Sequence, residues 1–357
     1  MFTEMTSTTT TITMPHNALT LIANLTTSSR AIAERQQARS LWMKSLELLE
    51  SADGVDLTQL AHFLNQLATV YQEQGDFAKT ERLFKRLSKL VERTGVDPEM
   101  ESLRPIVLRR MGSLYQAQGR YREAEDLLQR ALISAKTIFE AQSEEVAEIQ
   151  HHLAILHQER GRFDKAAKYY WRALRIYQQS SGFESLRVAG LYHDLSCLER
   201  KRGNVAEAEQ LASEALEMRM RVKGMTHLSV ATEMIWLAGL MADQEKFDDA
   251  ERLYRGAIGI LESSCDADHY EIANTLVKLA SVCAAQDRSG AAECYLLRAV
   301  AIKEKLFGIE NLEVAQLQGE LAQLYGRQSR HDEAERFSQR AQTTFVKATG
   351  PLKLEWE

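Results

Sequence analysis

The chain has 357 residues, of which 45% are hydrophobic and 26% are charged, so it can bury a large core and is not disordered throughout. Its formal net charge of -6 at pH 7 argues against a general nucleic-acid binder, which needs a basic surface to face phosphates. Only four prolines and 18 glycines, in a sequence rich in Ala, Leu, Glu, Gln and Arg, predict an all-α protein.

Two segments precede the regular part of the sequence. Residues 1–28 contain a threonine run and no apolar stretch long enough for a signal peptide, so we expect a flexible leader there. Residues 29–56 carry Ala38, Trp42 and Ser45 at the spacing of a second helix, and we expect them to cap the array as a degenerate half-repeat. No later stretch is long and apolar enough to span a bilayer. The four cysteines have neither disulfide nor metal-ligand spacing, which predicts a cytoplasmic protein.

Residues 57–347 repeat one pattern about seven times. "YQEQGDFAKTERLFKRL", "YQAQGRYREAEDLLQRA" and "HQERGRFDKAAKYYWRA" are versions of the same segment. The small residue in the second half of the pattern recurs every 42 residues after a first step of 44: Thr80, Ala124, Ala166, Ala208, Ala250, Ala292 and Ala334. A period of this length is typical of an array of stacked structural units.

Each unit predicts a pair of antiparallel helices. Apolar residues recur at helical spacing in the first half, as at Leu108, Met111 and Tyr115, so one helix buries this face. In the second half a small residue is followed four positions later by a bulky one, as at Ala166 and Tyr170, which lets two helices approach closely. The turn between the two halves is expected at Gly75, Gly119, Gly161 and Gly203.

This pattern resembles the tetratricopeptide repeat (TPR), in the 42-residue form of kinesin light chains and their bacterial relatives. The link between repeats in those proteins, Gly-x-x-His-x-x-Val-Ala, is matched by "RVKGMTHLSVA" from Arg221 and "KLFGIENLEVA" from Lys305. The resemblance implies a right-handed superhelical solenoid whose first helices line a concave groove, and a protein–protein interaction scaffold rather than an enzyme.

The face of the first helix next to its buried stripe supplies the candidate groove. Its candidate binding residues are Asn65, Gln72, Arg109, Arg110, Gln116, His151, Gln158, His193, Arg200, Ile235 and Val277. The first four repeats offer polar and basic side chains and the later ones offer Ile235 and Val277, so we expect an extended peptide with an acidic and an apolar end. Arginine forks such as those of Arg109 and Arg200 suit carboxylates.

The histidines of this face allow two further interpretations. His151 and His193 are one repeat apart, but neither Asp194 nor Cys197 completes a zinc-ligand spacing, so no metal and no cofactor is expected. If both rings face an acidic ligand, affinity should rise as the pH falls through about 6.5.

Residues 348–357 form a tail with an acidic tryptophan motif, "LEWE" at Leu354, Glu355, Trp356 and Glu357. Kinesin light chains capture cargo through segments in which Leu precedes an acidic residue, Trp and a second acidic residue. By this resemblance the tail is a candidate ligand for a groove of the same chain or of a second copy, which would make self-association possible.

The sequence therefore predicts a non-catalytic scaffold that binds an extended peptide or partner segment in its groove. Nucleophile-elbow, phosphate-loop and HExxH motifs do not occur. Two alternatives stay open. One is a self-assembling structural protein that uses its tail or end repeats, and the other is a peptide-sensing regulator.

Overall fold

The computed structural model describes residues 56–93, 97–180, 182, 184–266 and 268–349. The expected leader at 1–28, the capping segment except for Asp56, and the tail motif Leu354–Glu357 lie outside the described residues.

All regular secondary structure in the described residues is helical, which confirms the predicted all-α class. The helices are α3 (Leu57–Glu73), α4 (Phe77–Arg93), α5 (Pro98–Ala117), α6 (Tyr121–Ile138), α7 (Glu144–Glu159), α8 (Phe163–Ser180), α9 (Leu186–Arg202), α10 (Val205–Lys223), α11 (Leu228–Asp243), α12 (Phe247–Ser264), α13 (Tyr270–Ala285), α14 (Ser289–Phe307), α15 (Leu312–Arg327) and α16 (His331–Thr349).

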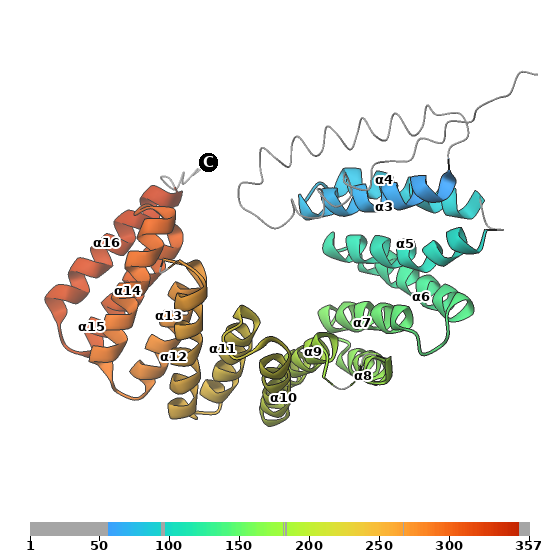
Figure 1. Ribbon diagram of the computed structural model, residues 1–357. Coiled ribbons are helices and arrows are strands. Elements are labelled where there is room, and N and C mark those ends of the chain that lie inside the picture. The colour runs from blue at the N-terminus through green and yellow to red at the C-terminus, as the bar shows by residue number, and fades with distance from the viewer. Residues whose placement is uncertain (1–55, 94–96, 181, 183, 267, 350–357) are drawn as a thin grey trace, which may run out of the picture. The chain divides into compact units, whose positions relative to one another are not determined.

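The helices form consecutive pairs in two compact units, residues 1–134 and 135–357. The first unit contains α3 to α5 and most of α6, and the second contains α7 to α16. Turns of two or three residues join the two helices of each pair, so the partners run antiparallel, as Figure 1 shows. Each pair in the second unit also packs against the next pair along the chain. This arrangement confirms the predicted stacking of helix pairs.

The turn inside each pair needs one residue with left-handed backbone geometry. The four predicted glycines occupy this position, with φ between 69° and 87° at Gly75, Gly119, Gly161 and Gly203. In the last three pairs the position is held by Glu245, Asp287 and Ser329, with φ between 56° and 60°. Because a side chain is strained in this conformation, these three turns are less stable than the glycine turns.

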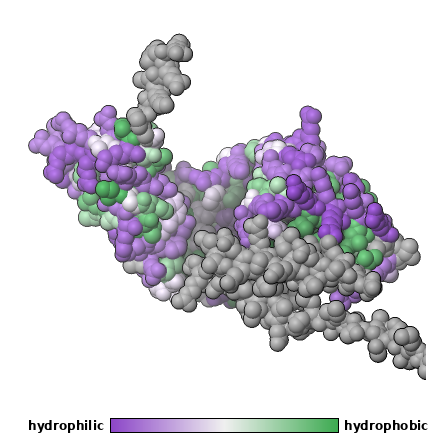
Figure 2. Space-filling view, turned by 90° about the horizontal axis from the view of Figure 1, so that it is seen from above, coloured by the Kyte–Doolittle hydropathy of each residue, from purple (hydrophilic) through white to green (hydrophobic). Residues whose placement is uncertain are grey.

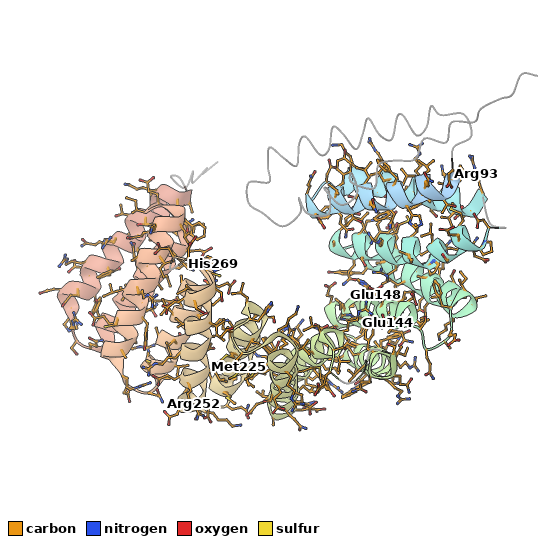
Figure 3. The ribbon with its side chains drawn as sticks, in the orientation of Figure 1. Arg93, Glu144, Glu148, Met225, Arg252 and His269 are labelled. Carbon is orange, nitrogen blue, oxygen red and sulfur yellow. The ribbon has the colours of Figure 1, made fainter. Side chains whose placement is uncertain are left out.

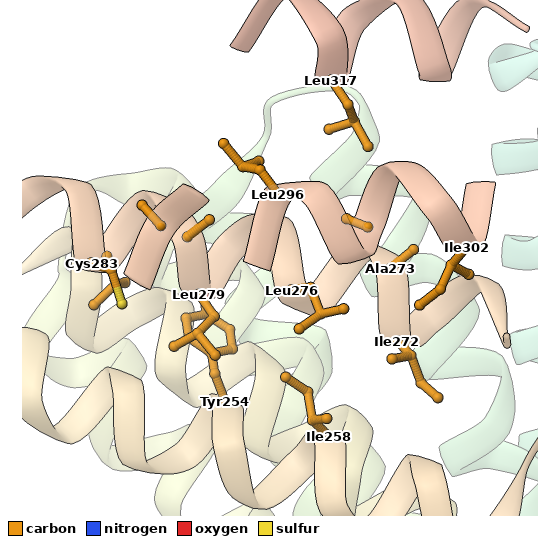
Figure 4. Close-up of a cluster of buried hydrophobic side chains, with 14 of the residues drawn as sticks. Tyr254, Ile258, Ile272, Ala273, Leu276, Leu279, Cys283, Leu296, Ile302 and Leu317 are labelled. Carbon is orange, nitrogen blue, oxygen red and sulfur yellow. The ribbon is translucent and has the colours of Figure 1, made fainter. Parts of the chain in front are cut away.

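The core lies between the helices of each pair and between neighbouring pairs. Ala166 and Tyr170 are buried as predicted, and so are the equivalent Ala250 and Tyr254. In the second unit one continuous cluster extends from α11 to α15 and includes Tyr254 together with leucines of α13 (Figure 4). The small residue therefore brings two helices together and the tyrosine ring fills the space beside it.

A recurrent ion pair ties successive pairs together. A basic residue in the turn of one pair contacts a glutamate on the second helix of the preceding pair, and both side chains are partly shielded from solvent. The contacts are Arg120 with Glu81, Lys246 with Glu209, Arg288 with Glu251, and Arg330 with Glu293. In the last of these, the Tyr325 hydroxyl donates to the same glutamate at 2.9 Å, and the Arg330 guanidinium lies 4.3 Å from the Tyr325 ring centre.

The surface of the described helices is mixed. The face shown in Figure 2 is mostly hydrophilic, with separate hydrophobic patches. Met225, labelled in Figure 3, lies in the loop between α10 and α11 and is one of the most exposed apolar side chains. Among the described helices, none combines the length and the apolar character needed to cross a membrane.

Candidate functional site

The two units divide the predicted groove residues between them. The first unit holds Asn65, Gln72, Arg109, Arg110 and Gln116. All five are half-buried, on α3 and α5. The guanidinium of Arg110 donates a hydrogen bond to the Thr69 hydroxyl of the preceding repeat, so this predicted ligand contact links α3 to α5.

In the second unit, His151 and Gln158 on α7 contact neighbouring helices. His151 Nε2 lies 2.6 Å from a carboxylate oxygen of Asp194 on α9, and both side chains are about one third exposed. The Gln158 side-chain oxygen accepts a hydrogen bond of 3.1 Å from the buried Tyr170 hydroxyl on α8. Both residues therefore hold helices of the chain together, and the His151 ring remains partly open to solvent.

His193 on α9 is part of a buried charge network. Its Nδ1 lies 3.0 Å from Glu233 on α11, a carboxylate that is only 1% exposed. Arg219 on α10 makes an ion pair with the other oxygen of Glu233 at 3.1 Å. Burial alone would lower the pKa of His193, but hydrogen bonds to Cys197 and Glu233 outweigh it and raise the pKa from 6.5 to about 10. The predicted titration near pH 6.5 is therefore wrong for His193.

Trp236 joins α9 to α11 beside this network. Its indole N–H donates a hydrogen bond of 2.8 Å to Ser196 on α9, and the Ser196 hydroxyl donates one of 2.7 Å to the Ala208 carbonyl on α10. The Trp236 ring lies 5.4 Å from the His193 ring and 5.1 Å from the Arg200 guanidinium, measured to ring centres. The half-buried indole, with one cation over its ring, is thus held in position by contacts within the chain.

Arg200 and Ile235 lie in the same pocket, about 380 Å³ in volume, on the face formed by α9, α11 and α13. Its lining includes Arg200, Ile235, Trp236, Gly239, Tyr254 and Lys278. Arg200 makes an ion pair of 2.7 Å with Asp243, and each side chain is more than one third exposed. Ile235 is 9% exposed and contributes to the apolar floor. Val277, also predicted for this face, is half-buried on α13 and is not part of the lining.

Two residues of the site were missed by the sequence analysis, although each leaves a signal in the repeat pattern. Glu233 stands where the other repeats carry Phe63, Val107, Ile149, Leu191, Thr275 and Leu317. Ser196 stands at a packing position where most repeats carry alanine. A polar residue in an apolar column predicts a buried group with a dedicated partner.

His151 and His193 do not share a metal-binding arrangement. Within the described residues, no group of three or more His, Cys, Asp or Glu side chains is placed to hold a metal ion. His151 and His193 instead each contact a different carboxylate.

Comparison with known proteins identifies the repeated unit. The family model described as tetratricopeptide repeat matches residues 103–179, 145–221 and 229–305, which together cover more than half of the chain. No curated protein sequence matches the chain significantly.

Solved structures of low identity share the fold. BtubC (BKLC) from P. vanneervenii has 24% identity and a TM-score of 0.57, over 64% of this chain and 91% of that one. A Podosopora anserina protein described as a kinesin light chain with nearly identical TPR-like repeats has 21% identity and a TM-score of 0.51, over 56% of this chain and 95% of that one. The apo quorum sensor NprR from B. thuringiensis has 13% identity and a TM-score of 0.53, over 92% of this chain and 96% of that one. At these identities the likeness establishes the architecture alone.

Proposed function

This chain belongs to the tetratricopeptide repeat family, and we propose that it is a non-catalytic protein-interaction scaffold that binds an extended partner segment on the face formed by α9, α11 and α13. Stacked helical repeats present extended surfaces suited to this task. The family match indicates no enzymatic class.

The pocket at Arg200 and Ile235 is the observation that carries the proposal. It combines an aromatic wall at Trp236 with space beside Gly239, where a glycine leaves room that a larger side chain would fill. The exposed ammonium of Lys278 adds positive charge at the rim. An apolar side chain of a partner would pack against Trp236 and Ile235, while an acidic neighbour would meet the rim cations.

Filling the pocket provides a direct test. Peptides selected from a phage-displayed dodecapeptide library on the full-length chain should bind saturably. Gly239→Leu should abolish that binding, because its side chain would occupy the pocket. An added Cβ at Gly239 meets only the Tyr254 hydroxyl at 3.6 Å, so the helix can accept the change. Gly259→Leu, on the second helix of the same pair, is the matched control, since an added Cβ there meets nothing within 4 Å. Failure to select any peptide, or equal binding by Gly239→Leu, would contradict the proposal.

A second candidate function is self-association through the C-terminal motif. The acidic and aromatic side chains of Glu355, Trp356 and Glu357 are chemically suited to a pocket with an indole wall and cationic rim, although the motif lies outside the described residues. A labelled peptide of residues 347–357 should then bind the full-length chain and lose binding with Trp356→Ala. The mass of the chain by sedimentation should also rise with concentration. If the chain has the mass of a monomer at every concentration and does not bind the peptide, self-association is ruled out. The pocket would then bind a segment of another protein.

A further inference from the structure

Two tyrosines occupy equivalent positions two repeats apart but differ in their hydroxyl contacts. Tyr170 and Tyr254 are 1% and 2% exposed, respectively. The Tyr170 hydroxyl donates to the side chain of Gln158. The position equivalent to Gln158 is Ala242 in the repeat of Tyr254, and a methyl group cannot accept a hydrogen bond. Within the described residues, the Tyr254 hydroxyl has no hydrogen-bond partner.

The unpartnered hydroxyl faces the pocket. The ring of Tyr254 belongs to the core cluster of Figure 4, and Tyr254 also lines the pocket. The hydroxyl end of the side chain therefore borders the pocket. A Cβ built on Gly239 would lie 3.6 Å from the hydroxyl oxygen, which places that oxygen directly beside the bare backbone of α11. Gly239 and Ala242 are the two small residues that keep the approach to this oxygen open.

The charges around the hydroxyl favour an anionic acceptor. Burial and the nearby Asp243 raise the pKa of Tyr254 to about 12, so the hydroxyl keeps its proton and can donate at neutral pH. The negative charge of Asp243 is already matched by Arg200. Lys278 also lines the pocket, and its ammonium makes no ion pair within the described residues, so the pocket carries one positive charge in excess.

We propose that Tyr254 is the hydrogen-bond donor of a subsite for the carboxylate of an acidic side chain in the bound segment. Lys278 supplies the balancing charge, and the adjacent Trp236 ring packs against the side chain next to that acidic residue. In the empty pocket the Tyr254 hydroxyl is bonded to no group of the described chain, and a carboxylate oxygen accepts a stronger hydrogen bond from it than a neutral acceptor does. This inference rests on the proposed function, because it names the chemistry of one position in the same groove.

The test is a double-mutant cycle on the full-length chain. Two probes are used. The first is the tightest-binding acidic dodecapeptide selected from the phage-displayed library. The second is the same peptide with the acidic residue replaced by its amide. Tyr254→Phe, which removes only the oxygen, should weaken binding of the acidic peptide roughly 10-fold and that of the amide peptide less, because a neutral amide oxygen accepts a weaker hydrogen bond than a carboxylate does. Tyr170→Phe is the matched control, because its hydroxyl already bonds inside the chain.

Ala242→Gln gives a second, independent variant. It should restore the internal acceptor that Gln158 provides for Tyr170, and thereby occupy the Tyr254 hydroxyl. We expect Ala242→Gln to weaken binding of the acidic peptide as Tyr254→Phe does. Urea unfolding of each variant will show that the fold is retained.

The outcomes separate this inference from the proposed function. Coupling between the Tyr254 hydroxyl and the peptide carboxylate supports it. Acidic-peptide binding that is lost in Gly239→Leu but unchanged in Tyr254→Phe overturns the subsite and leaves the groove in place. Selected peptides that bind without any acidic residue overturn the subsite in the same way. Absence of binding by the wild-type chain overturns both.

Discussion

Replacing His193 with glutamine should remove a pH-dependent part of the free energy of unfolding. The contacts with Cys197 and buried Glu233 raise the pKa of His193 to about 10, from 6.5 for an unperturbed histidine. Between these two pH values the folded chain holds one proton more than the unfolded chain. The stabilising contribution of His193 is therefore complete below pH 6.5, and it is lost as the pH rises through about 10.

The size of this contribution follows from the pKa shift and from the exposure of the ring. A shift from 6.5 to about 10, at about 1.4 kcal/mol per pKa unit, sets an upper limit on the order of 5 kcal/mol. Solvent reaches 28% of the His193 side chain and screens part of the interaction. We therefore expect roughly 2–4 kcal/mol at pH 6.

Urea unfolding of the wild-type chain and of His193→Gln, followed by circular dichroism from pH 6 to 9.5, measures the difference directly. Glutamine keeps an N–H group that can donate to Glu233, so the comparison isolates the charge. The wild-type advantage should be largest at pH 6 and shrink steadily toward pH 9.5. Glu233→Gln should reduce the same pH dependence, because it neutralises one of the two partners of His193. A wild-type advantage that stays constant across this range would refute the assigned charge network.

Three further predictions concern stability. Glu245→Gly should raise the free energy of unfolding by roughly 0.5–1 kcal/mol, as measured by the urea midpoint. Glycine relieves the strain of the left-handed conformation, and this gain exceeds the cost of the greater entropy that glycine gives the unfolded chain. Ser196→Ala should cost about 1–2 kcal/mol, since the Trp236 indole N–H loses its acceptor, and its fluorescence should shift. Arg330→Met should lower the urea midpoint, because it removes the ion pair with the partly shielded Glu293, whereas Arg252→Met, whose ion pair is largely exposed, should change the midpoint very little.

The helix pairs could be predicted because the same constraint acts in every repeat. A small residue must sit where two helices touch, and a left-handed residue must sit in the turn, so a 42-residue period becomes visible in Ala166, Ala208 and Ala250. The later turns were harder to locate, since Glu245 and Ser329 tolerate the left-handed conformation without being glycine. Hydrogen-bonding contacts elsewhere in each turn hold the conformation in place.

The groove could be predicted only in part. Column positions show which residues share a face, and on this basis Arg200 and Ile235 were predicted to lie on one face; both line the same pocket. Column positions do not show which charges pair across neighbouring repeats, because that depends on side-chain length and on the rotation between helix pairs. His151 and His193 were therefore interpreted as ligand contacts, whereas the structure gives each a carboxylate of the next repeat.

Departures from the repeat pattern lie beside the proposed pocket. A stacked array is stabilised by residues that recur, so a position that differs in one repeat either weakens the stack or serves another purpose. In α9 and α11 two such departures lie close together: Ser196 holds the indole of Trp236, and Gly239 leaves space beside the Tyr254 hydroxyl. Gly239 gives up side-chain packing, Ser196 makes two hydrogen bonds that an alanine could not make, and both residues shape the same pocket. A larger side chain at position 239 would pack against Tyr254 and fill the pocket, so the glycine favours the proposed binding over packing within the chain.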